Sequence, residues 1–183
     1  MISEKTKRFS RKKVFQGYTF DAVVDDVLWP NGNRLKRDLI VHPGITVIVP
    51  LLERDRMILL RQYRYGAGEI LWEVPAGTLK KGESPLACAK REIEEETGYK
   101  AKKWTKIHSF YPSPGFNTEV IHAFLAENLV KTQMRLEEDE ILETHVFRVS
   151  EVQKMIRDKK IRDAKSLVPL FYFLSERTQW ARK

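Results

Sequence analysis

The stretch REIEEETG, residues 91–98, places four glutamates within five positions of a chain whose formal net charge is +8. On a helix, like charges three or four residues apart repel each other by about 0.2–0.5 kcal/mol per pair. A basic protein that keeps this acidic run needs a partner that offsets the repulsion. The residues around the run indicate what that partner is.

The flanking residues predict that the acidic run lies on a helix from Pro85 to Thr97. Ser84 is typical of an N-cap, Pro85 of the first helical position and Gly98 of a C-terminal stop. Apolar residues at helical spacing form a stripe that would hold this helix on a sheet, and they are Leu86, Ala89 and Ile93.

Helical geometry separates the four glutamates into two faces. With Glu92 taken as zero, Glu96 lies at about +40° and Glu95 at about −60°, whereas Glu94 lies near 200°. Three carboxylates on one face provide the oxygen ligands that Mg²⁺ or Mn²⁺ prefers, and a solvated acidic surface is the alternative. A bound metal would cancel the repulsion, so the three glutamates should be a local cost to stability in its absence.

Spacing over a longer range favours the metal site. Residues 77–99 match the pattern G-x5-E-x7-R-E-U-x-E-E-x-G, in which U is a bulky aliphatic residue. The segment resembles the Nudix box, with Gly77, Glu83 and Arg91 at the specified positions before the glutamates. Tyr99 departs from the aliphatic residue that the family usually has there, which should affect packing rather than chemistry.

The Nudix resemblance implies an α/β fold (α+β mixed), an α/β/α sandwich around a mixed β-sheet. It also implies hydrolysis of a nucleoside diphosphate linked to a second moiety. The cofactor would be Mg²⁺, with Mn²⁺ as a substitute, at two or more ions per site when substrate is bound. Glu83 would support the site through a hydrogen bond or ion pair with Arg91. The implied metal ligands are Glu92, Glu95, Glu96 and the backbone carbonyl of Ala76.

The N-terminal residues 1–42 are predicted to form a small β unit, and residues 43–183 the hydrolase domain. VFQGYTFDAVVDDVLW (14–29) is predicted to be one strand, PNGN (30–33) a tight turn and RLKRDLIV (34–41) the returning strand. This hairpin has too few residues for a core of its own. It must therefore lie on its own domain or on a second copy of the chain.

The later part of the chain is predicted to alternate strands and helices. Ser150 and Gln153 form a capping-box pattern for one C-terminal helix. Ser166 would cap the next helix, because Pro169 is tolerated only in a first turn. The predicted strands are ITVIVPLL (45–52), RMILLRQY (56–63), ILWEVPAG (70–77), KIHSFY (106–111), VIHAFLA (120–126) and THVFRV (144–149).

Outside the box, the chain resembles the ADP-ribose and nucleoside-diphosphate-sugar pyrophosphatase branch. The resemblance rests on the PNG hairpin, on HPGITVIVPLL followed by RQYRYGAGEILWEVPAG, on SPGFNTE (113–119) and on LEEDE (136–140). It implies hydrolysis of ADP-ribose or a related nucleoside diphosphate sugar to a nucleoside monophosphate and a sugar phosphate. It further implies a homodimer in which the N-terminal β unit contacts, or is exchanged with, the second subunit.

The same resemblance implies a glutamate general base on the LEEDE loop. Glu140 is preferred because it lies closest to the strand that follows, and a loop with no catalytic role is the alternative. The other candidates in this loop are Glu137, Glu138 and Asp139.

Substrate contacts are predicted from three segments. Arg64 would suit a phosphate or a terminal ribose, because a guanidinium makes bidentate contacts to such oxygens. Arg61 is a weaker candidate because it sits deeper in the apolar strand, and ordinary surface ion pairs are the alternative for both. The SPGFNTE candidates are Pro114, Gly115 and Glu119. The candidates for stacking on the base, with core packing as their alternative, are Phe15, Tyr18 and Trp29.

Composition disfavours several other classes of protein. The start of the chain has no apolar run of the length that a signal peptide needs, and no later window is long enough for a membrane span, so a cytoplasmic protein without a membrane partner is expected. The single cysteine, Cys88, excludes an internal disulfide and is expected to pack as a small apolar residue.

Two alternative functions remain open from the sequence. The first is a Nudix pyrophosphatase acting on nucleoside triphosphates or 5′ RNA ends, which the positive charge supports. Nucleic acid is nevertheless disfavoured, since the basic residues form no continuous stripe with aromatics. The second is a non-catalytic nucleotide-sugar-binding module, which the complete set of three glutamates disfavours.

Overall fold

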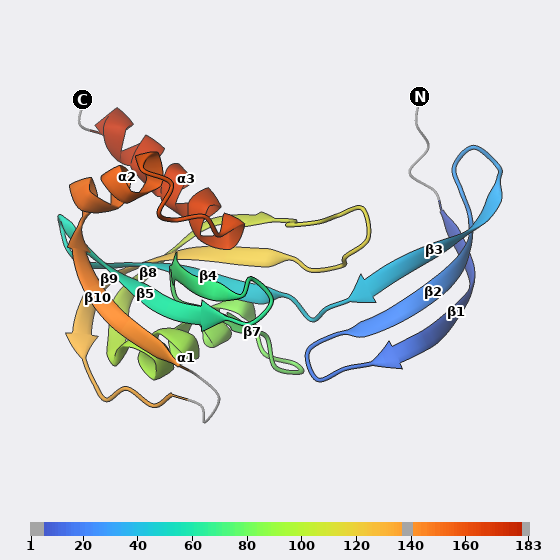
Figure 1. Ribbon diagram of the computed structural model, residues 1–183, viewed down its shortest axis with the longest axis horizontal. Helices are drawn as coiled ribbons and strands as arrows, with labels where there is room; N and C mark the ends of the chain where they lie inside the picture. The colour runs from blue at the N-terminus through green and yellow to red at the C-terminus, as the bar shows by residue number, and fades with distance from the viewer. Residues whose placement is uncertain (1–5, 137–140, 181–183) are drawn as a thin grey trace. The chain divides into compact units, whose positions relative to one another are not determined.

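The computed structural model describes residues 6–136 and 141–180 of the chain (Figure 1). The chain divides into two compact units. The first comprises Met1–Gly44 and Tyr111–Val120, and the second comprises Ile45–Phe110 and Ile121–Lys183. The N-terminal unit is therefore not a single continuous segment.

The first unit is a three-stranded antiparallel sheet in the order β1-β2-β3. Its strands are β1 Lys7–Gln16, β2 Asp21–Leu28 and β3 Arg34–Val41. The prediction of one strand over 14–29 was wrong, because the chain turns at Gly17, whose N–H donates to the Phe20 carbonyl at 3.0 Å. A Cβ at Gly17 would lie 2.8 Å from that same oxygen, so a larger residue would not fit this turn.

The basic N-terminal segment forms a strand that the sequence did not predict. Every residue of β1 is exposed, so the strand has no buried face from which a pattern could be recognised. Charge pairing with β2 explains why this exposed segment forms a strand. Arg11 donates from Nε and Nη2 to the two carboxylate oxygens of Asp25, each at 2.7 Å, and Asp25 is buried. Lys13 lies 2.6 Å from Asp21.

The segment 111–120 belongs to the first unit because its backbone is bonded to the end of β3. The Ile40 N–H donates to the Phe116 carbonyl at 2.8 Å, and the Thr118 N–H donates to the Ile40 carbonyl at 2.9 Å. The His42 N–H adds a bond to Thr118 Oγ1 at 3.0 Å. SPGFNTE is therefore attached to the N-terminal strands, although it lies within the range 43–183 that the sequence assigned to the hydrolase domain.

The second unit is built on a mixed sheet in the order β10-β5-β4-β9-β8. Strands β4 and β9 are parallel, and the other neighbours along this path are antiparallel. The mixed sheet is as predicted, although β8 extends well beyond the predicted KIHSFY strand. The strands are β4 Ile45–Glu53, β5 Arg56–Arg64, β8 Tyr99–Phe110, β9 Ile121–Lys131 and β10 Leu142–Arg148.

The segment predicted as one strand, ILWEVPAG, forms two short strands on different neighbours. β6, Glu69–Glu73, pairs with β5, and β7, Ala76–Thr78, pairs with β4. Between them, Pro75 has no N–H for a ladder, but its carbonyl accepts from Ile48 N at 2.9 Å. The chain thus crosses from β5 to β4 and brings β7 next to the helix that carries the glutamates.

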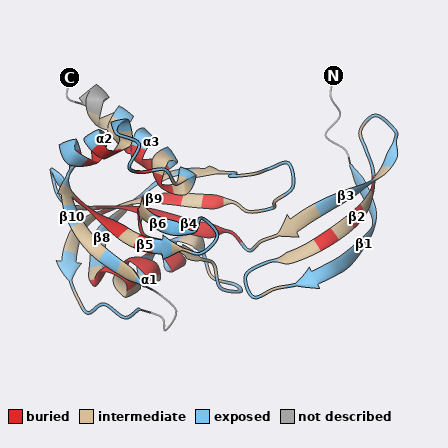
Figure 2. Cartoon of the chain, in the orientation of Figure 1, coloured by how far each residue is buried: buried red, intermediate tan, exposed pale blue. Residues whose placement is uncertain are grey.

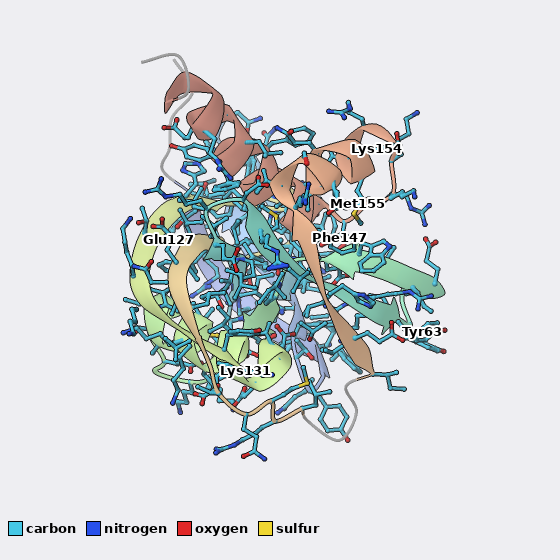
Figure 3. The ribbon with its side chains drawn as sticks, turned by 90° about the vertical axis from the view of Figure 1, so that its left-hand side faces the viewer. Tyr63, Glu127, Lys131, Phe147, Lys154 and Met155 are labelled. Carbon is cyan, nitrogen blue, oxygen red and sulfur yellow. The ribbon has the colours of Figure 1, made fainter. Side chains whose placement is uncertain are left out.

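Helices cover both faces of this sheet, which gives three layers (Figures 1 and 2). The helices are α1 Pro85–Thr97, α2 Val149–Arg157 and α3 Ala164–Trp180. Successive side chains of β4 point to opposite faces of the sheet. Ile48 packs with Ala89 and Ile93 of α1 on one face. Val47 and Val49 pack in the core under α2 and α3 on the other face. The side view in Figure 3 shows the labelled Phe147 and Met155 on the α2 side of the sheet.

The ends of α1 are as predicted. Ser84 Oγ accepts a hydrogen bond from Ala87 N at 3.3 Å, and Gly98 adopts the left-handed conformation with φ of 69°. Its N–H donates to the Glu94 carbonyl at 2.9 Å. Because the N-cap and the C-terminal glycine both act locally, they set the ends of the helix without help from the rest of the fold.

The predicted caps of the two C-terminal helices were wrong. Ser150 lies inside α2, and Glu151 accepts from Arg148 N at 2.7 Å instead. Asp163 caps α3, because its Oδ2 accepts from Ser166 N at 3.2 Å and from Ser166 Oγ at 2.6 Å. Pro169 therefore lies beyond the first turn, and the buried Leu170 and Phe173 beside it offset the lost backbone bond.

No helix within residues 6–136 and 141–180 is both long enough and apolar enough to span a membrane.

Candidate active site

The four glutamates of α1 differ in their surroundings, as the helical angles predict. Glu92 and Glu96 are buried, Glu95 is partly buried, and Glu94 forms an ion pair with Lys100 at 3.0 Å. Glu94 and Glu95 are exposed to a similar extent, at 24% and 28% of their side chains, so Glu94 is distinguished by its pair with a lysine of the following strand and not by its burial.

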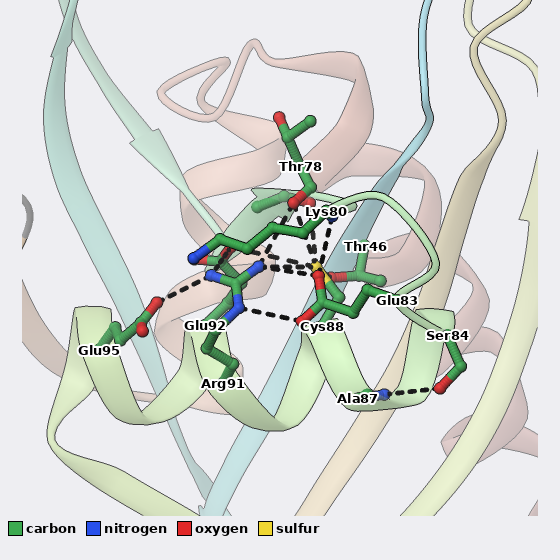
Figure 4. Close-up of polar contacts among 11 residues, drawn as sticks. Thr46, Thr78, Lys80, Glu83, Ser84, Ala87, Cys88, Arg91, Glu92 and Glu95 are labelled. Carbon is green, nitrogen blue, oxygen red and sulfur yellow. Dashed lines mark hydrogen bonds and ion pairs between the residues drawn. The ribbon is translucent and has the colours of Figure 1, made fainter.

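Arg91 is the centre of the polar contacts on α1 (Figure 4). Its Nη1 lies 2.6 Å from Glu92 Oε1 and 2.8 Å from Glu95 Oε2. Its Nε and Nη2 donate to the two oxygens of Glu83 at 3.0 and 3.1 Å, and Nη2 also donates to the Thr78 carbonyl at 3.3 Å. One guanidinium therefore ties the loop before α1 to two of the three glutamates.

The Glu83 pair was predicted from the sequence, but the other two contacts of Arg91 were not. The spacing i, i+4 between Arg91 and Glu95 is the signal that would have found one of them. The prediction that metal alone offsets the crowded charge was therefore incomplete, since Arg91 already offsets part of it. Hydrogen bonding to Arg91 lowers the pKa of Glu83 from 4.5 to about 2, and the same carboxylates raise the pKa of Arg91.

Strand β7, Ala76–Thr78, lies directly against the buried glutamates. The Ala76 N–H donates to Glu96 Oε2 at 3.0 Å. A Cβ on Gly77 would lie only 1.8 Å from Glu92 Oε1, so the backbone approaches this carboxylate more closely than any side chain would permit. The predicted ligand residues Ala76, Glu92 and Glu96 are thus brought together by β7 and α1.

Cys88 fills the space beneath this loop. Its Sγ lies 3.6 Å from both the Gly77 and Thr78 carbonyl oxygens and accepts from Thr46 Oγ1 at 3.4 Å. Burial raises the pKa of the thiol to about 11. Cys88 therefore stays protonated at neutral pH and packs as the small buried residue that the sequence predicted.

The donor chemistry of this cluster fits a hard divalent cation, because its side-chain donors are all carboxylate oxygens. Within the described ranges, however, no three His, Cys, Asp or Glu residues are arranged as a ready metal site. Nη1 of Arg91 lies against one oxygen of Glu92 and one of Glu95. A cation would have to share or replace those two contacts.

Arg64 lies at the end of β5 in an ion-pair network. It donates to Glu73 from Nε at 3.1 Å and from Nη2 at 2.6 Å, and Lys165 lies 2.7 Å from the same carboxylate. Burial opposes the charge of Arg64, but the bonds to Glu73 and the nearby charge of Glu96 more than offset it, so the pKa of Arg64 is raised. Arg64 is therefore within electrostatic range of the α1 carboxylates.

Arg61 is directed to the other face of the sheet. It is three residues from Arg64 on the same strand, and it pairs with Glu143 of β10 at 3.2 Å. Its side chain is 42% exposed, against 38% for Arg64, so the expectation that Arg61 sits deeper was wrong. For Arg61, the ordinary surface ion pair is what the structure contains.

The general-base candidates Glu137, Glu138, Asp139 and Glu140 lie outside the described residues. The residues on either side of them are both bonded to the C-terminal turn of α1. Arg135 N donates to the Glu95 carbonyl at 3.0 Å, and Thr144 Oγ1 donates to the Glu96 carbonyl at 3.2 Å. Arg135 and Thr144 are thus both bonded to the helix that carries the proposed ligands.

The remaining candidates belong to the first unit. Tyr18 is fully exposed, Phe15 is 54% exposed and Trp29 is 38% exposed, so none of the three packs in a core of this chain. Arg37 lies 4.3 Å above the Trp29 ring. In SPGFNTE, Glu119 accepts from Asn117 Nδ2 at 3.1 Å, whereas Pro114 and Gly115 are exposed.

A pocket of about 430 Å³ on the outer side of α1 was not predicted. It carries four basic side chains and two acidic ones, and Arg91 and Glu95 belong both to it and to the buried cluster. The residues that line it are Lys90, Arg91, Glu94, Glu95, Lys100, Ala101, Trp104 and Arg135.

Comparison with known proteins agrees with this architecture. ADP-ribose pyrophosphatase of Bacillus subtilis (strain 168) is 37% identical over 185 residues, covering 100% of both chains. The methanol dehydrogenase activator of Bacillus methanolicus is 35% identical over 174 residues, covering 94% of this chain and 93% of that protein. GDP-mannose pyrophosphatase of Yersinia enterocolitica serotype O:8 / biotype 1B (strain NCTC 13174 / 8081) is 34% identical and covers 85% and 84% of the two chains.

A solved structure has the same fold. A crystal structure of an ADP compounds hydrolase superposes with a TM-score of 0.84, at 22% identity, and the match covers 98% of each chain. The NUDIX domain description matches residues 42–171, which include the loop, α1 and the strands around them. The chain therefore belongs to the NUDIX domain family.

Proposed function

We propose that this protein hydrolyses the diphosphate of ADP-ribose or a related nucleoside diphosphate sugar, releasing a nucleoside monophosphate and a sugar phosphate. The observation that carries this is that one end of α1 holds Glu96 against Ala76 and joins Glu92 and Glu95 through Arg91. Full-length similarity to a protein named ADP-ribose pyrophosphatase supports the choice of substrate.

The proposed cofactor is Mg²⁺, or Mn²⁺ in its place, with two or more ions when substrate is bound. Glu92, Glu95, Glu96 and the Ala76 carbonyl would hold it, and it would supply charge neutralisation of the diphosphate and a more acidic water. Glu83 and Arg91 would keep the loop and α1 in register through their two charged hydrogen bonds.

Arg64 is the proposed contact for a phosphate or the terminal ribose. Its side chain is held by Glu73, and a guanidinium retains further donors when two of them are engaged. Arg61 remains a weaker candidate because it lies on the opposite face from Arg64.

Glu140 is the proposed general base, with Glu138 and Glu137 as the other candidates. Described residues before and after this segment support the proposal, because Arg135 N and Thr144 Oγ1 donate to the Glu95 and Glu96 carbonyls of α1. A base in this position would take the proton of the attacking water.

The protein is proposed to act as a homodimer in which the N-terminal β unit contacts, or is exchanged with, the second subunit. Support comes from its exposed aromatic side chains, because a three-stranded sheet is stable only if it covers one face. Phe15, Tyr18 and Trp29 would then stack on the base. Pro114, Gly115 and Glu119 would join them, since their loop is bonded to β3. A cytoplasmic location stays a prediction from composition.

One observation favours a second substrate class. The pocket on the outer side of α1 combines Trp104 with Lys90, Lys100 and Arg135, and this combination suits a phosphate-rich chain such as a 5′ RNA end. Nucleoside triphosphates and RNA ends therefore belong in the same experiment.

A substrate panel with Mg²⁺ tests the proposal. ADP-ribose, ADP-glucose, GDP-mannose, ATP and 5′-triphosphorylated RNA are incubated with the protein, and the products are separated by chromatography. We expect AMP and ribose 5-phosphate from ADP-ribose, and loss of this activity in Glu96→Gln. Turnover of ATP or RNA alone would replace the sugar-nucleotide assignment, and binding of ADP-ribose without any product would identify a binding module.

A further inference from the structure

Arg91 divides its contacts in a way that the predicted Glu83 pair does not explain. Nε and Nη2 hold the two oxygens of Glu83, and Nη2 also holds the Thr78 carbonyl. Nη1 takes no part in that anchor and instead contacts both Glu92 and Glu95. One half of the guanidinium therefore fixes the loop, and the other half faces the carboxylates proposed to hold metal.

The Nη1 contacts are shorter than those that anchor the loop. The distances to Glu92 and Glu95 are 2.6 and 2.8 Å, against 3.0 to 3.3 Å for the contacts to Glu83 and Thr78. Glu92 is buried, and a buried carboxylate without a counter-charge is strongly destabilising. Nη1 thus places a positive charge against the buried Glu92.

We propose that Arg91 is an internal counter-ion that occupies part of the metal site. Its Nη1 neutralises Glu92 and Glu95 while no divalent cation is bound, and a cation displaces Nη1 from these oxygens. Nε and Nη2 stay on Glu83 and Thr78 throughout, so the loop keeps its position. This inference rests on the metal site of the proposed function.

Two consequences follow for the protein without metal. Arg91 reduces the repulsion among the glutamates, so the site stays folded before a cation arrives. Arg91 also competes with the cation, so metal affinity is lower than the carboxylates alone would give. Stability and affinity should therefore change in opposite directions when the guanidinium is removed.

The test compares Arg91→Met with the wild type in the absence and presence of Mn²⁺. In EDTA, we expect the midpoint of thermal unfolding to fall by roughly 10 °C, because a buried charge network loses its cation. By isothermal titration calorimetry, we expect Mn²⁺ to bind roughly tenfold more tightly, because no charged hydrogen bond has to be broken. Mn²⁺ should accordingly raise the unfolding midpoint more in the variant than in the wild type.

Lys100→Met is the matched control. It also removes one positive charge next to α1, but Lys100 pairs with Glu94 and not with the ligand carboxylates. We expect its Mn²⁺ affinity to change by less than about twofold, because exposed ion pairs contribute little. An equal gain in both variants would mean that general electrostatics, rather than displacement of Nη1, sets the affinity.

A measurement on the wild type covers the case in which Arg91→Met does not fold. In the ¹⁵N spectrum of the arginine side chains, addition of Mg²⁺ should shift the Nη1 signal of Arg91 and leave its Nε signal nearly unchanged. Unchanged Nη1 signals, or weaker Mn²⁺ binding in Arg91→Met, would overturn the counter-ion role. If the wild type binds neither Mg²⁺ nor Mn²⁺, the metal site of the proposed function itself is wrong.

Discussion

Gly77 lies directly beneath Glu92, and a Cβ at position 77 would come within 1.8 Å of the carboxylate oxygen Oε1. Position 77 must therefore be a glycine, because a side chain there would overlap the Glu92 carboxylate. This contact joins β7 to the buried face of α1, where the proposed ligand Glu92 lies.

Gly77→Ala should remove most activity by displacing Glu92. We expect kcat/KM for ADP-ribose to fall by roughly 100-fold, since a shift of about 1 Å in a catalytic group has this effect. Gly66→Ala is the control, because a Cβ there meets nothing within 4 Å. Steady-state kinetics of both variants would check the prediction, and a fully active Gly77→Ala would show that the Glu92 position is not critical.

The ion pair of Glu83 with Arg91 should make the free energy of unfolding depend on pH in the acidic range. The pKa of Glu83 is about 2 in the folded protein and 4.5 in its ordinary state, so the folded protein binds fewer protons in that window. The stabilisation by Glu83 is complete above the ordinary value and is lost as pH falls towards 2. Urea unfolding between pH 5 and pH 3 should show a shallower decline in Glu83→Gln than in the wild type. Parallel declines would contradict the Arg91 pair as the cause.

Arg64→Lys should weaken substrate binding. The arginine can bind Glu73 with two of its N–H groups and keep the others free for the substrate, whereas a lysine keeps the charge but has no planar guanidinium. We expect KM for ADP-ribose to rise by roughly tenfold. Arg61→Lys, on the opposite face, serves as the comparison and should leave KM near its normal value. A normal KM in Arg64→Lys would mean that Arg64 does not contact the substrate, and an equal rise in Arg61→Lys would add Arg61 to the contacts.

Glu140→Gln should lower kcat by roughly 100-fold or more while KM changes little, because a general base acts on the water and not on substrate affinity. Parallel Glu138→Gln and Glu137→Gln variants identify the base if Glu140→Gln retains the normal rate. Three active variants would leave the loop without a catalytic role.

Ser166→Ala should destabilise the junction of β6 and α3. Ser166 is fully buried, accepts from Val74 N at 2.9 Å and donates to Asp163. Its removal leaves a buried N–H without a partner, which costs about 1–3 kcal/mol. Chemical denaturation should detect this loss, whereas the exposed Ser175→Ala should remain near wild-type stability. A wild-type value for Ser166→Ala would mean that Val74 N finds another acceptor.

The sequence by itself determined the helix Pro85–Thr97 and the face that its glutamates share. The capping serine, the proline, the terminal glycine and the helical spacing all act within a few residues, so no tertiary information is needed. The strand β4 and the mixed α/β class were equally readable, because a fully buried strand leaves a continuous apolar run.

Only the tertiary structure decided how distant segments meet. In the folded chain, ILWEVPAG forms β6, which pairs with β5, and β7, which pairs with β4. Residues 111–120 are bonded to β3, and the basic segment Lys7–Gln16 pairs with β2 as a strand. Asp163, and not Ser166, caps α3, because the Ser166 hydroxyl accepts a hydrogen bond from Val74 N while Asp163 accepts from Ser166 N. These outcomes depend on which partner supplies a hydrogen bond or a charge, and that information is absent from local spacing.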